Sequence, residues 1–165
     1  AVIDRAGNIR LLEPIQLPGT RRAFVMILDD SPSIDPNDSA NTIVVVGKSE
    51  PRRYAACVVL APHRLDVNRV VRARLSTRKA SFAAAEETRA LTGMEIGGVT
   101  PFGLPPDLPI WIDAAVMTRA RVVLGGGSRH WKVIAPPAIL LTIPRVEVVD
   151  GLAADPTQEA LARDP

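Results

Sequence analysis

Two runs of β-branched and small apolar residues, TIVVV at 42–46 and YAACVVL at 54–60, constrain the fold more than any other feature of the chain. Each run has the length of a strand, and the polar segment GKSEPRR between them is rich in turn-forming residues. The pattern predicts a β-hairpin whose two strands are each buried on at least one face. FVMIL at 24–28 predicts another strand, and the turn formers DDSPSIDPNDS after it predict a surface loop.

Two amphipathic helices are predicted after the hairpin. Apolar residues recur at helical spacing between Asp66 and Leu75, and a second helix is expected to begin near Ser81 or Phe82 and to end at Gly93. Because strands and helices alternate irregularly, the sequence predicts an α+β fold, in which a mixed, mostly antiparallel β-sheet is flanked by a few helices. The later elements are expected as strands at 111–113, 121–124, 132–134 and 146–149 with short helical turns at 114–117 and 136–141.

The length of 165 residues suits one ordinary domain. We expect this domain to occupy residues 1–151, and residues 152–165 to form a frayed tail because they are rich in Ala, Asp and Pro without an apolar period. No long apolar run or basic leader is visible, so neither a membrane span nor a secretory signal is expected. The single cysteine, Cys57, fits a reducing compartment, and the expected localisation is cytoplasmic.

Several kinds of chemistry are disfavoured by the residues present. Cys57 has apolar neighbours, which raise a thiol pKa and keep the group inert. His63 and His130 have no neighbouring Ser or Cys arrangement that would suggest a triad, and with the one cysteine they form no cluster with the ligand count or spacing of a zinc site. The glycine triplet at 125–127 lacks the patterns of a phosphate loop and of a dinucleotide site. No metal and no other cofactor is therefore expected.

The stretch from Pro51 to Ala80 is basic, with Asp66 as its single acidic residue. Arginine side chains can hold the phosphates of a nucleic acid through bidentate hydrogen bonds. A solvated helix face is the alternative interpretation, because basic faces are common on soluble domains. The basic residues of this stretch are Arg52, Arg53, Arg64, Arg69, Arg72, Arg74, Arg78 and Lys79.

A loop rich in glycine and proline, GGVTPFGLP at 97–105, follows the second predicted helix. Glycine allows a positive φ and a close approach of a ligand to the backbone, while proline stiffens the loop. Such a loop can present N–H groups to the negative charge that develops on an ester carbonyl during hydrolysis. The alternative is a tight structural connection between helix and strand.

The segment LTGMEIGGVTPFGLP resembles the Gly-x-x-x-Pro loop of the YbaK and prolyl-tRNA-synthetase insertion-domain family, with Gly97 and Pro101 at the ends of the motif. Four other segments resemble successive segments of that family, and the likeness is clearest over residues 40–151. These segments are RKASFA at 78–83, DLPIWIDAAVM at 107–117, VVLGGG at 122–127 and APPAILL at 135–141.

The resemblance implies a trans-editing deacylase that hydrolyses the ester of a mischarged tRNA without a cofactor. A second sieve of this kind is needed because a synthetic site cannot exclude small or near-isosteric side chains. An aminoacyl-tRNA is the implied partner, and a synthetase is a second candidate partner. The implied site comprises catalytic Asn41, Gly97, Gly98, Pro101 and Asp113, substrate-binding Lys79, Ser81, Val99, Thr100, Phe102 and Gly126, and tRNA-binding Arg52, Arg53, Arg69, Arg72 and Arg78.

The sequence departs from the family pattern at Asn41, where many editing members carry a lysine before the first hairpin strand. An amide forms hydrogen bonds but brings no charge to a developing oxyanion. We therefore expect one of two functions, a deacylase in which Lys79 supplies the missing cation, or a catalytically silent module that binds aminoacyl-tRNA or a small ligand. A structural partner domain with no affinity for tRNA is a third alternative. The first forty residues also depart from the family.

Overall fold

The computed structural model describes residues 2–3, 9–10, 35–129 and 131–156. The chain separates into two compact units, residues 1–33 and residues 34–165. In the first unit, β1 (Val2–Ile3) pairs antiparallel with β2 (Ile9–Arg10). The strand predicted at 24–28 lies outside the described residues. The second unit contains the remaining described elements.

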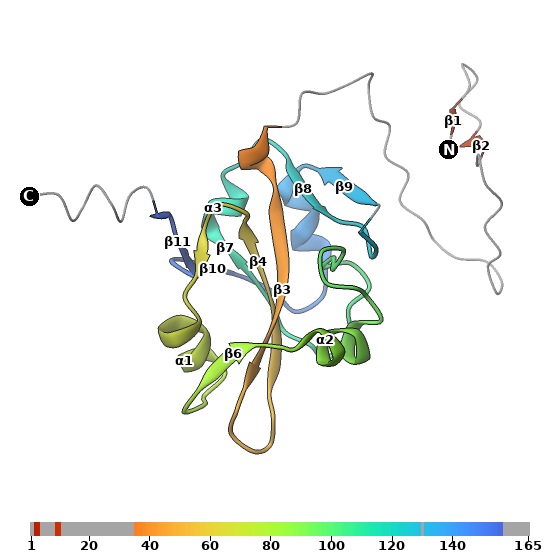
Figure 1. Cartoon of the computed structure of the whole chain (residues 1–165). Helices are drawn as coiled ribbons and strands as arrows, with labels where there is room; N and C mark the ends of the chain where they lie inside the picture. Colours follow the sequence, from red (N-terminus) through yellow and green to blue (C-terminus); the bar gives the residue numbers. More distant parts are fainter. Residues whose placement is uncertain (1, 4–8, 11–34, 130, 157–165) are drawn as a thin grey trace, which may run out of the picture. The chain divides into compact units, whose positions relative to one another are not determined.

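A five-stranded sheet in the order β10-β7-β4-β3-β6 forms the centre of the second unit (Figure 1). The predicted hairpin is confirmed, because β3 (Ala40–Gly47) pairs antiparallel with β4 (Tyr54–Leu60) over seven residue pairs. The other strands of this sheet are β6 (Ala80–Phe82), β7 (Ile110–Asp113) and β10 (Val146–Val149). β6 pairs antiparallel with β3, whereas β7 runs parallel to both β4 and β10.

Two small antiparallel sheets complete the strands. β5 (Arg64–Leu65) pairs with β11 (Ala153–Ala154), and β8 (Val122–Gly125) pairs with β9 (Lys132–Ala135). Among the described strand pairings, two are parallel and the others are antiparallel. The predicted α+β fold with a mixed, mostly antiparallel set of strands is confirmed.

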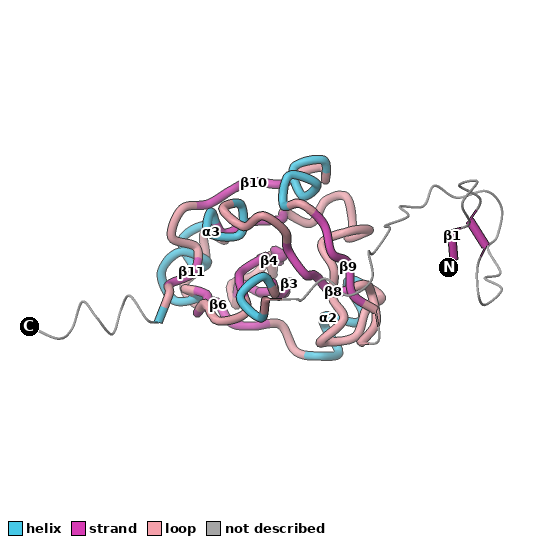
Figure 2. The backbone as a smooth tube through the Cα atoms, turned by 90° about the horizontal axis from the view of Figure 1, so that it is seen from above, coloured by secondary structure: helices cyan, strands magenta, loops and turns pink. Residues whose placement is uncertain are grey.

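The helical segments are short and lie around the sheet (Figure 2). The helix predicted over 66–75 is a π-helical turn, η2 (Val67–Val71), that continues as α1 (Arg72–Arg74). α2 (Ala85–Thr92) begins later than predicted, because residues 80–82 pair with β3 as β6, and it ends at Gly93 with a φ of +72°. The remaining helical segments are η1 (Pro36–Asp38), α3 (Ala114–Met117) and η3 (Pro137–Thr142).

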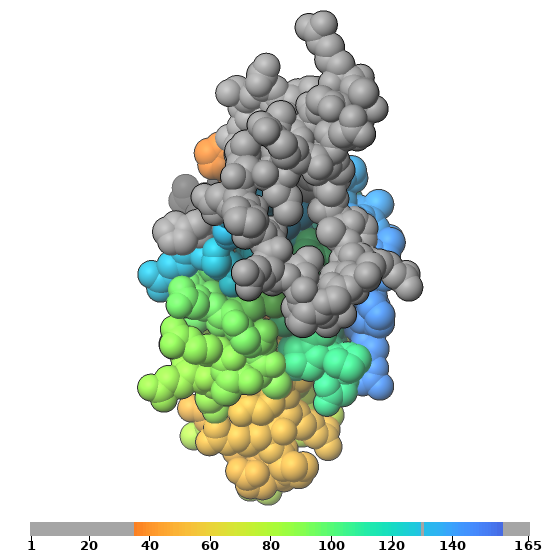
Figure 3. Space-filling view, turned by 90° about the vertical axis from the view of Figure 1, so that its right-hand side faces the viewer, coloured from red at the N-terminus to blue at the C-terminus, as the bar shows by residue number. Residues whose placement is uncertain are grey.

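The core occupies both faces of the sheet, as the alternation along β4 requires. Ala56 and Val58 point into one cluster with Ile110 and Ile112, and their neighbours Cys57 and Val59 point into the cluster on the opposite face. The hairpin end of β3 and β4 extends beyond the rest of the sheet (Figure 1) and forms a lobe below the α2 segment in the space-filling view (Figure 3).

The prediction of a frayed tail after Gly151 is wrong for residues 152–154. Leu152 is completely buried, and Ala153 and Ala154 form β11. The amide of Ala153 also donates to the carboxylate of Asp113, which explains why the chain remains attached beyond the glycine. Residues 157–165 lie outside the described part. No helix in the described ranges is long and apolar enough to cross a bilayer.

Candidate functional site

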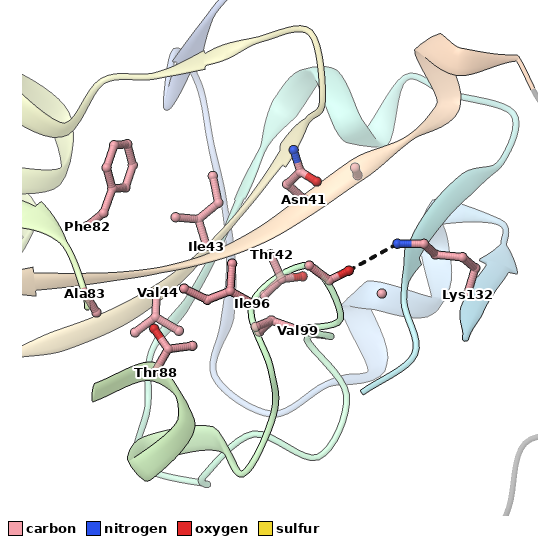
Figure 4. A pocket seen from close by; sticks show the side chains of 13 residues that line it. Asn41, Thr42, Ile43, Val44, Phe82, Ala83, Thr88, Ile96, Val99 and Lys132 are labelled. Carbon is pink, nitrogen blue, oxygen red and sulfur yellow. Dashed lines mark hydrogen bonds between the residues drawn. The ribbon is translucent and has the colours of Figure 1, made fainter. Parts of the chain in front are cut away.

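The candidate site is a hollow of about 450 Å³ at the edge of the first half of β3 (Figure 4). β6 pairs with Val45, Val46 and Gly47, and the amide of Ala83 donates to the carbonyl oxygen of Val44, so the edge of residues 40–43 is left open to the hollow. The lining residues come from β3, β6, α2, the glycine loop, β8 and β9. They are Ala40, Asn41, Thr42, Ile43, Val44, Phe82, Ala83, Thr88, Ile96, Gly97, Val99, Gly125 and Lys132.

The hollow has a buried floor and an exposed rim because β3 alternates its side chains between two faces. Thr42 and Val44 lie on the same side of the strand as Thr88 and Val99 (Figure 4), and all four residues are buried. Phe82 lies on the other side, opposite Val45 in the strand register, and is 58% exposed. The floor therefore suits a small, mostly apolar group, whereas the rim faces water.

The glycine loop is held against the β8–β9 hairpin by backbone contacts. The amide of Gly127 donates to the carbonyl oxygen of Gly98 at 2.7 Å. A Cβ atom at Gly98 would lie 2.3 Å from the carbonyl carbon of Ser128, and one at Gly125 would lie 2.3 Å from the carbonyl oxygen of Val99. Both positions therefore require glycine, because any side chain would force the two backbones apart.

The prediction that the amide of Gly98 donates to an oxyanion is wrong. The amide of Gly98 donates to the carbonyl oxygen of Glu95 at 2.9 Å, so it is not free to stabilise an oxyanion. No hydrogen bond within the described residues uses the amide of Gly97 or of Val99. These two residues line the hollow and remain the loop's candidate donors.

Lys132 brings a positive charge to the site. Its Nζ donates to the carbonyl oxygen of Gly97 at 3.3 Å, reaching across from the first residue of β9 (Figure 4). It is the charged residue among those lining the hollow. Its place in the site was not predicted, because residues 132–134 carried only a strand signal and nothing in the sequence places β9 beside β3.

Lys79 does not supply the expected cation. It lines a different hollow with Lys48, Arg72 and Arg78. Its neighbour Ala80 pairs with Gly47, and Gly47 lies six residues along β3 from Asn41, a separation of about 20 Å at roughly 3.3 Å per residue. The expectation that Lys79 faces the site across the pocket is therefore wrong.

Asp113 is a structural residue. It is 2% exposed, and its two carboxylate oxygens accept hydrogen bonds from the amides of Ala115 at 3.0 Å and Ala153 at 2.8 Å. The first bond caps α3, and the second fastens β11 beside the sheet. Asp113 does not line the hollow, so its predicted place at the rim is wrong.

The remaining predicted residues divide between the site and its surroundings. Asn41, Gly97 and Val99 line the hollow. Six other predicted residues lie outside the hollow: Ser81, Gly98, Thr100, Pro101, Phe102 and Gly126. Pro101 is fully buried, Phe102 packs against the core, and the hydroxyl of Thr100 accepts a hydrogen bond from the amide of Phe102. Gly126 lies against Trp131, and Ser81 lines a neighbouring hollow. The lining residues that were missed are Ala40, Thr42, Ile43, Val44, Phe82, Ala83, Thr88, Ile96, Gly125 and Lys132.

The predicted tRNA-binding arginines are not equivalent. Arg52 forms an ion pair with Glu87, and Arg69 forms one with Asp66 at 3.1 Å. Arg53 donates to the carbonyl oxygen of Leu75. Arg72 and Arg78 instead line the basic hollow with Lys48 and Lys79, and none of these four residues forms an ion pair within the described part of the chain.

Cys57 and the potential metal ligands lie outside the site's chemistry. Burial raises the pKa of the Cys57 thiol to about 12, so little reactive thiolate is expected at neutral pH. Within the described ranges, no group of three or more His, Cys, Asp or Glu side chains is placed to hold a metal ion. His130 is not described.

Comparison with known proteins assigns a family to this chain. The family model of the aminoacyl-tRNA editing domain matches residues 28–143. The crystal structure of a candidate trans-editing enzyme for prolyl-tRNA synthetase has a TM-score of 0.61 and 28% identity, over 70% of this chain and 71% of that chain. The crystal structure of a hypothetical protein has a TM-score of 0.63 and 26% identity, over 71% of this chain and 75% of that chain.

A more distant likeness, to a candidate signal transduction protein from Marinobacter aquaeolei, extends only to the fold. It has 18% identity and a TM-score of 0.53, over 77% of this chain and 27% of that chain. The family model covers well over half of the sequence, including the open edge of β3 and the glycine loop. The chain belongs to the aminoacyl-tRNA editing domain family.

Proposed function

We propose that the chain is a trans-editing deacylase that hydrolyses the ester of a mischarged aminoacyl-tRNA. The observation that carries this proposal is the ammonium group of Lys132 at the mouth of a small, mostly apolar hollow. A small aminoacyl side chain fits the floor beside Val44 and Val99, and the ester then lies at the mouth near Lys132 and Asn41. Lys132 on β9 thus supplies the positive charge that Asn41 on β3 lacks.

The reaction is the addition of water to an ester carbonyl. The water oxygen bonds to the carbonyl carbon, negative charge develops on the carbonyl oxygen, and the bond from that carbon to the ribose oxygen then breaks. A proton moves to the ribose oxygen, which leaves a free amino acid and a tRNA with its terminal hydroxyl groups restored. Lys132 and the Asn41 amide would act on the developing charge, because donors aimed at it lower the barrier.

No carboxylate, imidazole or thiol is among the residues that line the hollow. The proton acceptor for water must therefore come from outside this set. The terminal ribose carries a hydroxyl next to the ester, and the aminoacyl group carries its own amine, so the substrate brings groups that can hold and pass the proton. The protein's contribution is then to position the ester and stabilise charge, which suits a site built largely from backbone and small residues.

A silent binding module is the second candidate, and Asn41 is the observation that favours it. Such a module would bind the acceptor end in the same hollow but release no amino acid. The position of Lys132 at the mouth favours the deacylase, because a cation there can stabilise the negative charge that develops on the ester during hydrolysis. The two functions differ in turnover and share the expected affinity for tRNA.

The test is deacylation of tRNAs charged with a panel of small amino acids. The candidate trans-editing enzyme among the structural relatives makes tRNA with the proline anticodon the first acceptor to try. We expect the wild-type chain to release at least one small amino acid and to leave prolyl-tRNA intact. Binding without release for every member of the panel would instead establish the silent module.

A further inference from the structure

Three hollows on the described surface form one continuous track that begins at the candidate site. The site and a second hollow share Phe82, and the second hollow shares Asn68 with the basic hollow that contains Lys79. The second hollow lies between β5, η2, β6 and β11. The track therefore starts at the open edge of β3, runs along β6, and ends near the N-terminal end of β6 and the start of α1.

Positive charge is concentrated at the far end of this track. The site contributes Lys132, and the middle hollow contains Arg64 and Arg69 with Asp66, which pairs with Arg69. The far hollow contains four exposed cations and no acidic residue, namely Lys48, Arg72, Arg78 and Lys79. A surface with its strongest positive charge at a distance from an ester site complements a polyanion that is attached to the ester.

Phe82 marks the boundary between the site and the track. Its side chain is 58% exposed although it is a large apolar group in a strand. It lines both the site and the middle hollow and lies on the same side of β3 as Asn41 and Ile43 (Figure 4). An exposed aromatic ring beside a cationic groove is the arrangement on which proteins stack the bases of single-stranded nucleic acids.

We propose that this track binds the single-stranded 3′ end and the adjoining acceptor stem of the tRNA, with a terminal base stacked on Phe82 and stem phosphates in the hollow of Lys48, Arg72, Arg78 and Lys79. The inference rests on the proposed function, because the ester fixes where the 3′ end begins. The separation of about 20 Å between Asn41 at the site and Gly47, which pairs with Ala80 of the basic hollow, leaves room for unpaired nucleotides between the ester and the paired stem.

A second exit from the site lies on the opposite side, and it provides the matched control. The hollow of Arg89, Glu95 and Arg129 meets the site at Ile96. The positive charge of this hollow is partly neutralised, because Arg89 forms an ion pair with Glu95 at 3.4 Å. The track over Phe82 is therefore the more favourable path for phosphates, and Arg89→Ala removes one surface charge without touching that track.

The experiment is fluorescence anisotropy with an uncharged acceptor-stem minihelix that ends in unpaired ACCA, and with the same minihelix lacking the unpaired end. We expect Phe82→Ala to weaken binding of the first probe roughly tenfold, the effect of losing one stacked base, and to leave the second unchanged. Lys79→Ala and Arg78→Ala should weaken both probes and reduce the salt dependence by about 0.7 to 0.9 in log–log slope for each phosphate that the variant no longer binds. Arg89→Ala should change neither value.

Three results would overturn the inference: no binding of either probe by the wild type, equal losses for Phe82→Ala on both probes, or a loss for Arg89→Ala with none for Lys79→Ala. Because the probes carry no amino acid, the measurement is independent of hydrolysis. If the chain binds the probes along the track but releases no amino acid, the result contradicts the proposed deacylase function and leaves the track proposal standing. A chain that hydrolyses the ester equally well at subsaturating enzyme with and without the track residues would contradict the track alone.

Discussion

Lys132 and Gly97 are joined by a hydrogen bond that connects β9 to the glycine loop across the mouth of the site, with 3.3 Å between Nζ and the carbonyl oxygen. The bond holds a flexible lysine in place without neutralising its charge, because a carbonyl oxygen carries only a partial negative charge. Two of the three ammonium hydrogens remain available to a ligand. Gly97, with a φ of +90°, turns its carbonyl toward the lysine in a conformation that other residues rarely adopt.

Lys132→Ala is expected to lower the deacylation rate by about a hundredfold or more, the usual effect of removing one donor that stabilises an oxyanion. Single-turnover release of labelled amino acid measures this change. Lys132→Arg should retain part of the rate because it keeps the charge. Lys79→Ala is the matched control, because it removes a lysine that lies outside the site, and its single-turnover rate with saturating enzyme should equal that of the wild type.

Gly98→Ala is expected to destabilise the fold by about 2 kcal/mol or more, because the new Cβ atom would lie 2.3 Å from backbone atoms of Ser128. Gly103→Ala provides the comparison. Its Cβ atom would meet nothing within 4 Å, so it should cost only the strain of a φ of +75°, about 1 kcal/mol. Urea denaturation followed by circular dichroism measures both values, and equal losses would contradict the packing argument.

The elements of the fold were predictable where the residues act locally. The hairpin of β3 and β4 follows from two β-branched runs, and the end of α2 follows from Gly93. The start of α2 was missed because residues 80–82 gain more from pairing with β3 than from continuing a helix. The attachment of Leu152 and β11 was missed because it depends on Asp113, which is distant in the sequence.

The site was only partly predictable for the same reason. Asn41 and Gly97 carried a sequence signal and do line the hollow. Lys132 and Thr88 carried none, because their place depends on how the β8–β9 hairpin and α2 are arranged around the open edge of β3. Asp113 showed the opposite error, since a carboxylate on the strand after the glycine loop was given a place at the site, whereas its oxygens bind two backbone amides of the fold.

The lowered pKa of Asp38 predicts that the free energy of unfolding decreases in acid. Burial would raise the pKa of this carboxyl, but the hydrogen bonds and charges of Arg119 and Arg121 outweigh burial and hold the pKa below its ordinary value. The stabilisation is therefore complete above about pH 4, near the unfolded value, and is lost as pH falls through the lower folded value. Urea midpoints measured between pH 2.5 and 7 for the wild type and Asp38→Asn should converge at the acid end. A constant difference between the two would contradict this assignment.

Cys57 is expected to be unreactive in the native protein, because burial raises the pKa of its thiol to about 12 and the side chain lies inside the sheet's core. A thiol-specific disulfide reagent at pH 7.5 should release no chromophore until urea unfolds the chain. The deacylation rate should be unchanged by prior treatment with iodoacetamide. Rapid labelling of the folded protein would contradict the burial of this residue.

Thr42 gives a prediction that separates stability from substrate choice. Its hydroxyl is buried in the floor of the site and has no hydrogen-bond partner within the described residues. A buried hydroxyl without a partner is destabilising, so Thr42→Val is expected to stabilise the chain by about 1 kcal/mol in urea denaturation. Thr100→Val should instead destabilise it, because the hydroxyl of Thr100 accepts a hydrogen bond from the amide of Phe102.

The same substitution should leave substrate choice unchanged, because the Thr42 hydroxyl is buried and is not exposed to a group bound in the hollow. We expect Thr42→Val to release seryl and alanyl groups in the same ratio as the wild type, since a site that loses no exposed hydrogen-bonding group keeps its discrimination. A changed ratio would show that the hydroxyl contacts the substrate, and a destabilised variant would show that the hydroxyl has a partner after all.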